Sequence, residues 1–583
     1  MEISTIGRPR NVGWLRAAAL LYGDWGTSKA YTIGLALFFV GYAALPHLLA
    51  VCLVTAVVGV NYIWLCRCYA TGGGVYTAAG RHSRRLAMIG GLLLLADFIV
   101  TASLSCLDGF HYLGFGHAEA KKWAITAIFA IGALNFFGPK HTGSIAVWLA
   151  VPTVVVVGIL IVAGVPHLRN FHPAWPTGGL LPNWIAFTGM ILALSGVEAA
   201  ASSTGVMKLD AGATPDRPSV HLTSRRAVTA VMLEVVLATV ALSVLAMCLP
   251  LAADQLGAHK EDMLRYMGTT FVGPWFGKLV GVVFGVLLIS AVNTAIGGMV
   301  ALMYVMARDH EIPEPFTQLN RFGVPFLPLI TATILPVIVL DLSDSVESLS
   351  HLYAIGVVGA IVLDIGSTAL AKGLPLKSYQ RKIMVGTTCV MLLIWVTIAL
   401  TKVYALLFVV SVIGVGLLVR EYTYRHRHLT AAAPPAPPAP PPSGAPGAPK
   451  FLGQTIVVAA RGWTPALQFA LEEARVRNAT LHVLYIREVA VNINVTSKLQ
   501  DDPDARALFA RLDSEAAGVK LNKLYGTSDS PADTIIDIAA TFGADTVVLG
   551  GSRRATLVNL LKGNVVARVA AQLPEFMHLI VIG

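Results

Sequence analysis

Residues 22–31 read YGDWGTSKAY, and they say more about the architecture than any other ten residues of the chain. It interrupts a long apolar segment with two glycines, an aspartate, two hydroxyl side chains and a lysine. Gly23 and Gly26 weaken a helix, and the aspartate and hydroxyls around them compete for backbone hydrogen bonds. We therefore expect the helix to unwind for one turn and to restart near Lys29.

A helix break inside a membrane is tolerated only where the backbone is buried in protein or lines a cavity. Unwinding frees carbonyl oxygens, and these, together with the carboxylate of Asp24, are what a desolvated cation needs. The alternative is that Asp24 or Thr27 simply caps the restarted helix. A buried aspartate is costly where a serine would cap equally well, which favours an ion site.

A second stretch of this kind, LALSGVEAAASSTG at residues 192–205, lies about five spans later. Gly196, Gly205 and the hydroxyl residues weaken the helix, and Glu198 is an acid in mid-membrane. Broken segments at corresponding positions of two repeats point to the central site of a transporter. The sequence therefore predicts two inverted repeats of five helices, with breaks in the first and sixth spans.

The composition places most of the chain in lipid. Of the 583 residues, 55% are hydrophobic and 13% are charged, against about 25% charged in soluble domains. We count about twelve apolar stretches of spanning length, the last ending near His428. With both termini in the cytoplasm, inside loops hold about 21 Lys and Arg and outside loops about 7. The net charge of +10 thus reflects topology in the cell membrane, and we expect no nucleic-acid partner.

Two further spans carry intramembrane acids. In the third, Asp97, Thr101 and Ser105 recur at every fourth position and share one helix face. The hydroxyls have the alternative of bonding to their own helix, but an intramembrane carboxylate points to function. In the tenth span, Asp364 is either a proton carrier or an acid facing cytoplasmic water.

The organisation changes after the last span. Residues 429–450 are rich in proline, which favours a semi-rigid extended linker. Residues 451–583 alternate short apolar strands with helices, which predicts a cytoplasmic α/β domain with a doubly wound parallel sheet. We thus divide the chain into an all-helical membrane domain (1–428), the linker and this domain. Neither domain shows a nucleophile–base pair or a metal cluster, so we expect no enzyme, no cofactor and no resident metal.

Several motifs carry a family resemblance. The stretches above, with CYATGGGVY at residues 68–76 and SAVNTAIGG at 290–298, resemble the amino acid–polyamine–organocation (APC) superfamily over about residues 13–425. GDWGTSKAY is similar to the GDxGTSPLY pattern of the KUP potassium uptake family. The spacing of Asp24 and Tyr31, and the sequence SGVEA at 195–199, also resemble the KimA-like potassium–proton symporters.

This resemblance implies a LeuT-like fold, a potassium ion and a coupled proton. Carried over residue by residue, it assigns potassium to Asp24, Tyr31, Asp97, Thr101 and Ser195. Proton coupling would use buried acids, here Glu198 and Asp364. Lys29 stands where the KUP pattern has proline, and two placements are open: an ion pair with Asp24, or extension to water.

Residues 452–583 resemble the universal stress protein family. Its nucleotide-binding members carry a glycine-rich phosphate loop, which here retains Gly550 and Gly563 but has Arg553 at the second glycine position. Arg461 replaces the aspartate after the first strand. Arginine side chains can hold phosphates, so a regulatory nucleotide is one interpretation. A dimerisation module with a vestigial site is the other, and the resemblance implies a homodimer through this domain.

The sequence therefore predicts proton-coupled potassium import across a bacterial cell membrane, regulated by the C-terminal domain. A proton-coupled amino acid permease is the first alternative. The second alternative is a membrane receptor that signals without transport.

Overall fold

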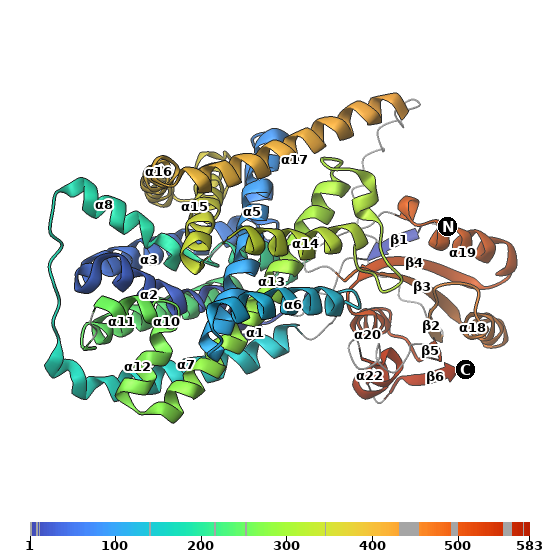
Figure 1. The fold of residues 1–583 in the computed structure, drawn as a ribbon. Coiled ribbons are helices and arrows are strands. Elements are labelled where there is room, and N and C mark those ends of the chain that lie inside the picture. The colour runs from blue at the N-terminus through green and yellow to red at the C-terminus, as the bar shows by residue number, and fades with distance from the viewer. Residues whose placement is uncertain are drawn as a thin grey trace.

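The computed structural model has two parts, a helical bundle and a parallel α/β domain (Figure 1). It describes residues 3–6, 10, 12–138, 142–214, 217–250, 253–343, 345–430, 454–490, 499–551, 563–574 and 576–583. Most of the predicted proline-rich linker lies outside these ranges.

The bundle contains seventeen α-helices among the described residues, and some neighbouring helices are separated only by a short break. Eight stretches are long and apolar enough to cross a membrane by length and composition, and the first, Trp14–Cys68, holds α1 to α3. The sequence-based count of about twelve is larger because the first stretch joins several helices and because shorter helices such as α8 and α14 are not among the eight. The helices are α1 (Trp14–Trp25), α2 (Ser28–Val40), α3 (Ala44–Cys68), α4 (Gly74–Gly80), α5 (Arg84–Leu113), α6 (His117–Asn135), α7 (Thr142–Gly164), α8 (Leu180–Gly189), α9 (Ala199–Ser203), α10 (His221–Ala246), α11 (Ala253–Ala258), α12 (Met263–Phe271), α13 (Pro274–Arg308), α14 (Phe326–Leu342), α15 (Val346–Leu370), α16 (Ser378–Thr401) and α17 (Val403–Thr430).

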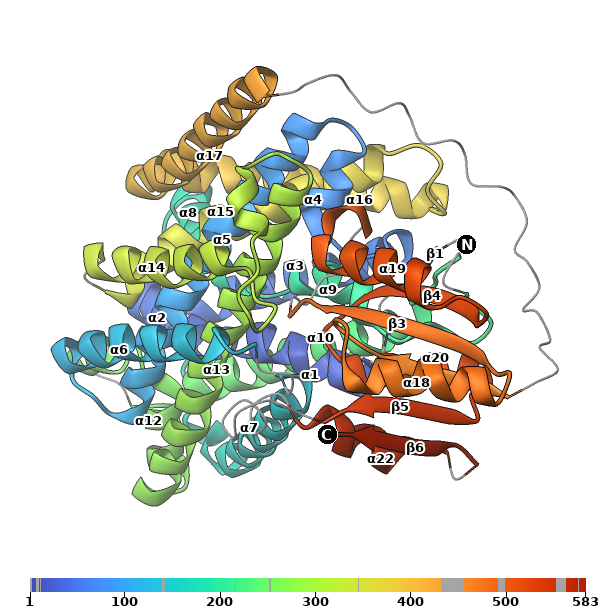
Figure 2. The same ribbon diagram turned by 90° about the vertical axis from the view of Figure 1, so that its right-hand side faces the viewer.

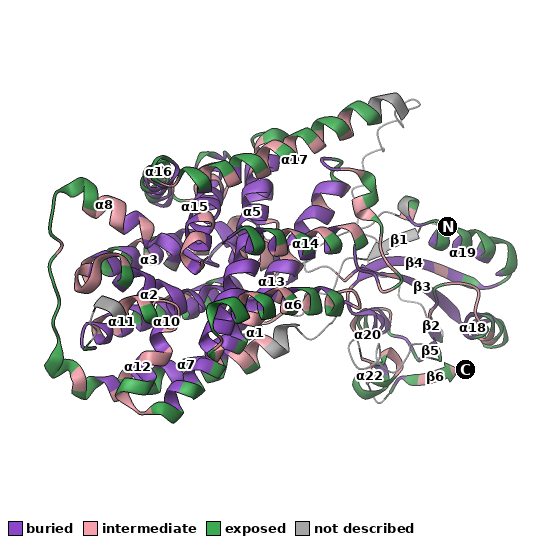
Figure 3. Cartoon of the chain, in the orientation of Figure 1, coloured by how far each residue is buried: buried purple, intermediate pink, exposed green. Residues whose placement is uncertain are grey.

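Helix α5 forms the centre of the bundle. Almost all of its length is buried, and it packs along α13, α15 and α4. By contrast, α16 and α17 expose large apolar side chains such as Leu393 and Leu418, and Figure 3 shows this exposed outer surface. An apolar exterior around a buried central helix that carries acids such as Asp97 is typical of a multi-pass membrane protein.

The α/β domain is a six-stranded, all-parallel sheet with helices on both faces (Figure 2). Helices α18 and α19 cover one face, and α20 and α22 cover the other, each over its own apolar core. The doubly wound architecture predicted from the sequence is confirmed. The strand order is β1-β4-β3-β2-β5-β6, and the elements are β1 (Ile3–Ile6), β2 (Thr455–Ala459), α18 (Pro465–Val476), β3 (Thr480–Glu488), α19 (Pro503–Glu515), β4 (Lys520–Ser528), α20 (Pro531–Thr541), β5 (Thr546–Gly550), α22 (Val565–Gln572) and β6 (His578–Ile582).

Strand β1 departs from the predicted domain boundaries. It pairs with β4 in the register Ile3↔Lys523 to Ile6↔Gly526, so residues 3–6 complete the C-terminal sheet although the sequence assigned them to the membrane domain. Four residues make a strand only because the β4 edge supplies hydrogen-bond partners, which a local pattern cannot reveal.

The two parts also meet at the end of β3. Val489 packs against Ala301 and Tyr304 of α13, and the Ala490 N–H donates to the Gly323 carbonyl at 2.9 Å. Gly323 has φ +80°, and a Cβ there would lie 2.3 Å from the Glu488 carbonyl oxygen. The α/β domain therefore touches the end of a long central helix of the bundle.

Candidate ion-binding site

The first helix break is tighter than the sequence predicts. Helix α1 ends at Trp25 and α2 begins at Ser28, and the two residues between them keep right-handed helical dihedrals. A Cβ at Gly26 would lie 2.5 Å from the Tyr22 carbonyl oxygen, which explains the glycine. Gly23 lies within α1 with nothing within 4 Å of such a Cβ, so this predicted helix break is wrong at Gly23 and holds at Gly26.

Hydroxyl side chains donate hydrogen bonds to the backbone carbonyl groups at this break. Thr27 Oγ1 donates to the Asp24 carbonyl at 2.5 Å, and Ser28 Oγ donates to the Trp25 carbonyl at 2.8 Å. Helix α2 has no side-chain cap. The capping alternative for Asp24 and Thr27 is therefore excluded, and the Asp24 carboxylate remains available for another role.

The second break meets the first. Between α8 and α9 the chain forms a short 3-10 helix, Ile191–Leu194, and then a turn. Gly196 in this turn has φ +87°, and a Cβ there would lie 2.4 Å from the Trp25 backbone nitrogen. Only glycine permits this conformation and this approach together. Gly196 thus lies at an interruption between two helical segments, and the two breaks contact each other.

Three carboxyl groups gather at this crossing. Asp24, Asp97 and Glu198 are 3%, 0% and 3% exposed, and each interacts electrostatically with the other two. Asp24 Oδ1 and both carboxyl oxygens of Asp97 and of Glu198 have no hydrogen-bond partner among the described residues. Three buried acids this close cannot all carry charge unless cations or protons compensate them.

Hydroxyl groups complete the surroundings of these acids. The Tyr353 hydroxyl donates to Ser195 Oγ at 2.7 Å, and Tyr31, which is 1% exposed, interacts with both Ser195 and Asp24. Thr101 Oγ1 donates to the Asp97 carbonyl at 2.9 Å, which leaves its oxygen lone pairs free. The five residues that the resemblance assigned to potassium thus lie in one buried region.

Lys29 adopts neither of the two placements considered from the sequence. It is completely buried, and its Nζ lies 2.8 and 2.7 Å from the two carboxyl oxygens of Glu234 on α10. The Tyr22 hydroxyl also donates to Glu234, and Lys29 Nζ contacts that hydroxyl at 3.1 Å. The ammonium group is therefore neutralised by Glu234 and does not compensate Asp24.

Asp364 lies apart from the three acids. It is 1% exposed, which excludes the alternative that it faces cytoplasmic water. Its carboxyl group interacts with Tyr62 of α3, and Tyr62 interacts in turn with Glu198. Tyr62 thus lies between the acid cluster and a second buried carboxyl group.

Three residues of this region were missed from the sequence. Asp108 is completely buried on α5 and interacts with Tyr31. It follows Asp97 by eleven positions, which is three helical turns, so the spacing of intramembrane acids could have found it. Glu234 offered the same signal as an acid within an apolar helix. Tyr353 offered no such signal, because a tyrosine in a membrane span usually serves only to pack against neighbouring helices.

The residues predicted to bind a nucleotide in the α/β domain are only partly placed by the structure. Arg461 forms an ion pair with Glu488 at 3.0 Å, so its guanidinium group already has a carboxylate partner. Gly550 ends β5, and Gly563 has φ +74°. Arg553 lies outside the described residues. A phosphate fork at Arg461 would have to compete with Glu488.

Comparisons with known proteins match both parts of the chain. A family model described as amino acid permease matches residues 12–436, and one described as universal stress protein family matches residues 454–575. The L-asparagine permease of Escherichia coli strain K12 is 24% identical over 255 residues, covering 41% of this chain and 48% of that protein. The potassium transporter KimA of Bacillus subtilis strain 168 is 24% identical over 373 residues, covering 59% of this chain and 58% of that protein.

An uncharacterised protein of Methanocaldococcus jannaschii, MJ0609, is 28% identical over 232 residues, covering 39% of this chain and 51% of that protein. The chain thus aligns with about half the length of these relatives. The relatives include transporters named for an amino acid and for potassium, so similarity alone leaves the substrate open.

Proposed function

The chain belongs to the amino acid permease family, with a universal stress protein domain at its C-terminal end, and on that premise we propose that it is a secondary transporter that imports potassium together with protons. The observation that carries the proposal is the cluster of Asp24, Asp97 and Glu198 at the contact between the two helix breaks. A cluster of this kind needs positive charge to be stable when ionised.

Lys29 strengthens the case for a mobile cation. If Lys29 had paired with Asp24, the protein would have supplied its own counter-charge. Because Glu234 neutralises Lys29, the three acids depend on ions that enter from water. Carboxylate, hydroxyl and carbonyl oxygens are the ligands that a partly dehydrated potassium ion accepts, and the region contains all three kinds.

The electrostatics of the cluster support proton coupling. Glu198 interacts with both Asp97 and Asp24, so a proton on Glu198 changes how strongly the two aspartates attract a cation. Tyr62 interacts electrostatically with both Glu198 and Asp364, and we propose Asp364 as the next acid to receive the proton. Each positive charge moved inward gains about 2.3 kcal/mol per 100 mV of membrane potential, which favours accumulation.

Amino acid transport is the second candidate, and the match to the amino acid permease family favours it. A zwitterionic substrate places its carboxylate against free backbone amides at a broken helix. Here Asp24 lies at that break with its Oδ1 unpartnered, and two carboxylates would repel each other. This repulsion is the reason to prefer a cation.

The α/β domain would regulate transport through its contact with α13, where Val489 packs on Tyr304. A homodimer through this domain remains a proposal carried by the family resemblance. Light scattering of the purified full chain tests it, because a single-chain mass in detergent would contradict it.

The test of the main proposal is uptake of labelled rubidium, a potassium analogue, into vesicles that contain the purified chain and carry a proton gradient. We expect uptake by the wild type, none by Asp24→Asn, and full uptake by Asp341→Asn, a control acid that is exposed on α14. Competition by unlabelled potassium but not by amino acids supports the proposal. Uptake of a labelled amino acid with no rubidium uptake would assign the second candidate instead.

A further inference from the structure

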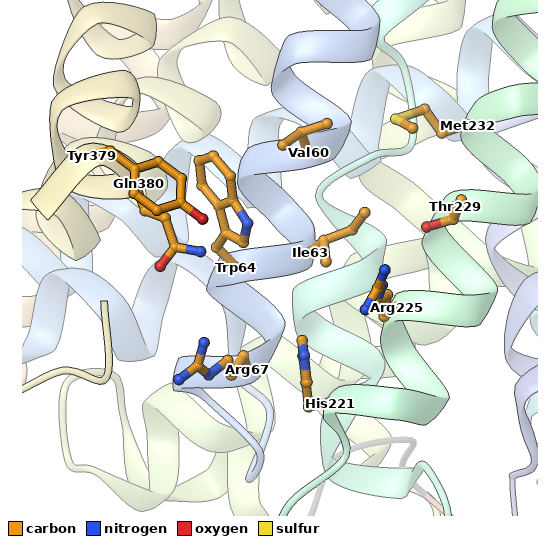
Figure 4. A pocket seen from close by; sticks show the side chains of 10 residues that line it. All are labelled: Val60, Ile63, Trp64, Arg67, His221, Arg225, Thr229, Met232, Tyr379 and Gln380. Atoms are coloured by element: carbon orange, nitrogen blue, oxygen red, sulfur yellow. The ribbon is translucent and has the colours of Figure 1, made fainter. Parts of the chain in front are cut away.

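A pocket outside the acid cluster lies between α3, α10 and α16 and has a volume of about 440 Å³. Its lining residues contain two arginines and a histidine but no acid (Figure 4). They are Val60, Ile63, Trp64, Arg67, His221, Arg225, Thr229, Met232, Tyr379 and Gln380. This combination is what binds a phosphate group.

The basic groups of the pocket are free to bind an anion. Among the described residues, no carboxylate lies within ion-pair distance of Arg67 or Arg225. Asp210, near the start of α10, is occupied in another way, because it accepts hydrogen bonds from the backbone N–H groups of Leu222 and Thr223. The two guanidinium groups therefore give the pocket a net positive charge.

The pocket is polar at one end and apolar at the other. Figure 4 shows Arg67 and His221 at one end, Arg225 between the ends, and Val60 and Met232 at the opposite end. On each of the two helices the arginine and the apolar residue are seven positions apart, a separation of about 10 Å along the axis. A ligand that fills the pocket needs an anionic head and an apolar body.

The walls of the pocket face lipid. Tyr379, which lines the pocket on α16, is 53% exposed, in a helix that is long and apolar enough to span a membrane. The Trp64 and Tyr379 rings stand edge to face with centroids 6.3 Å apart, and such rings are typical of the boundary between headgroups and acyl chains. The basic end belongs to the side of the bundle that the sequence assigns to the cytoplasm.

We propose that this pocket binds one phospholipid with an anionic headgroup, whose phosphate contacts Arg67 and Arg225 and whose acyl chain lies along Ile63, Val60 and Met232. The site is independent of the ion cluster. Because α10 also carries Glu234, the partner of Lys29, a lipid seated here contacts the helix that holds the first-span lysine in place.

The test is native mass spectrometry of the purified full chain titrated with phosphatidylglycerol or phosphatidylcholine. We expect the wild type to retain one phosphatidylglycerol in preference to phosphatidylcholine. In Arg67→Gln/Arg225→Gln the apparent affinity falls about thirtyfold, since each of the two arginines near a membrane surface contributes about 1 kcal/mol. Arg226→Gln is the matched control, because Arg226 is exposed beside Arg225 but does not line the pocket.

A second variant separates a lipid from a soluble phosphate. Val60→Trp fills the apolar end and leaves both arginines in place, so it weakens binding of a phospholipid but not of glycerol phosphate. Equal retention by the double arginine variant and the wild type would overturn the proposal. Equal loss in Arg226→Gln, or binding of glycerol phosphate as strong as that of phosphatidylglycerol, would also overturn it. A thermal unfolding curve for each variant shows that the chain is folded in every titration.

Discussion

Two buried charged regions lie within one helix length of each other and are built in opposite ways. Around Lys29, the protein supplies its own counter-charge, since Glu234 contacts the ammonium group with both carboxyl oxygens. Around Asp24, Asp97 and Glu198, acids face acids. A satisfied pair is costly to break and holds helices together, whereas an unsatisfied cluster can change its charge with ions and protons.

The largest effect should come from removing one acid of the cluster. We expect Asp97→Asn to lower rubidium uptake to the background of empty vesicles, because it removes a ligand charge that no neighbour replaces. Its unfolding midpoint in mixed micelles should stay the same or rise, since a buried carboxyl group without hydrogen bonds costs stability. A clear loss of stability with intact uptake would show that Asp97 is structural.

Breaking the ion pair between Lys29 and Glu234 should mainly lower stability. Glu234→Gln leaves the buried Lys29 without a counter-charge, and we expect a loss of about 3 kcal/mol in the free energy of unfolding. The exposed pair Lys121–Asp341 is the control, where Asp341→Asn should cost less than about 1 kcal/mol. The double variant Lys29→Met/Glu234→Leu should recover most of the loss. If it does not, the pair has a role beyond charge neutralisation.

Separating the two helix breaks should have a smaller effect on both rubidium uptake and the free energy of unfolding. Gly196→Ala forces a side chain into a positive-φ position that lies against the Trp25 backbone, at a cost of about 2 kcal/mol. Uptake should fall as well, because the displaced turn carries Ser195 and Glu198. Gly158→Ala, at a position on α7 with nothing within 4 Å, should change neither quantity.

The smallest effect concerns a third way of burying an ionisable group, by keeping it neutral. The ring of His482 on β3 is tilted against that of Phe542 with centroids 4.3 Å apart, and burial lowers its pKa to about 4. The unfolded chain, with a pKa near 6.5, takes up a proton first as the pH falls. Stability of the α/β domain is therefore complete above pH 6.5 and declines toward pH 4.

His482→Phe should make the stability of the α/β domain depend less on pH. The measurement is the free energy of opening of residues 455–583, obtained from hydrogen exchange of the full chain at a series of pH values. An unchanged slope would contradict the assignment of the pH dependence to His482. The surface residue His578 gives the matched variant, His578→Phe, which should leave the slope as it is.

Much of the fold and of the acid cluster could be predicted from local sequence. Gly26 and Gly196 weaken helices by themselves, and Asp97 is conspicuous among apolar neighbours. The partner of Lys29 could not be predicted, because Glu234 lies 205 positions away and many intramembrane acids compete for the role. The prediction of a break at Gly23 was wrong because a glycine ends a helix only where the surrounding structure requires it, and Gly23 lies within α1.

Local sequence is enough to predict the apolar spans, the weak points in the first and sixth of them, and the doubly wound C-terminal domain. These features depend on periodicity and on residues within a few positions of one another. Three features are visible only in the folded chain: which charges neutralise each other, the contact of Gly196 with Trp25, and the pairing of residues 3–6 with a sheet formed by residues 455–582. Each of these depends on segments that are distant in sequence, and burial makes an unsatisfied charge or strand edge too costly to leave to local preference.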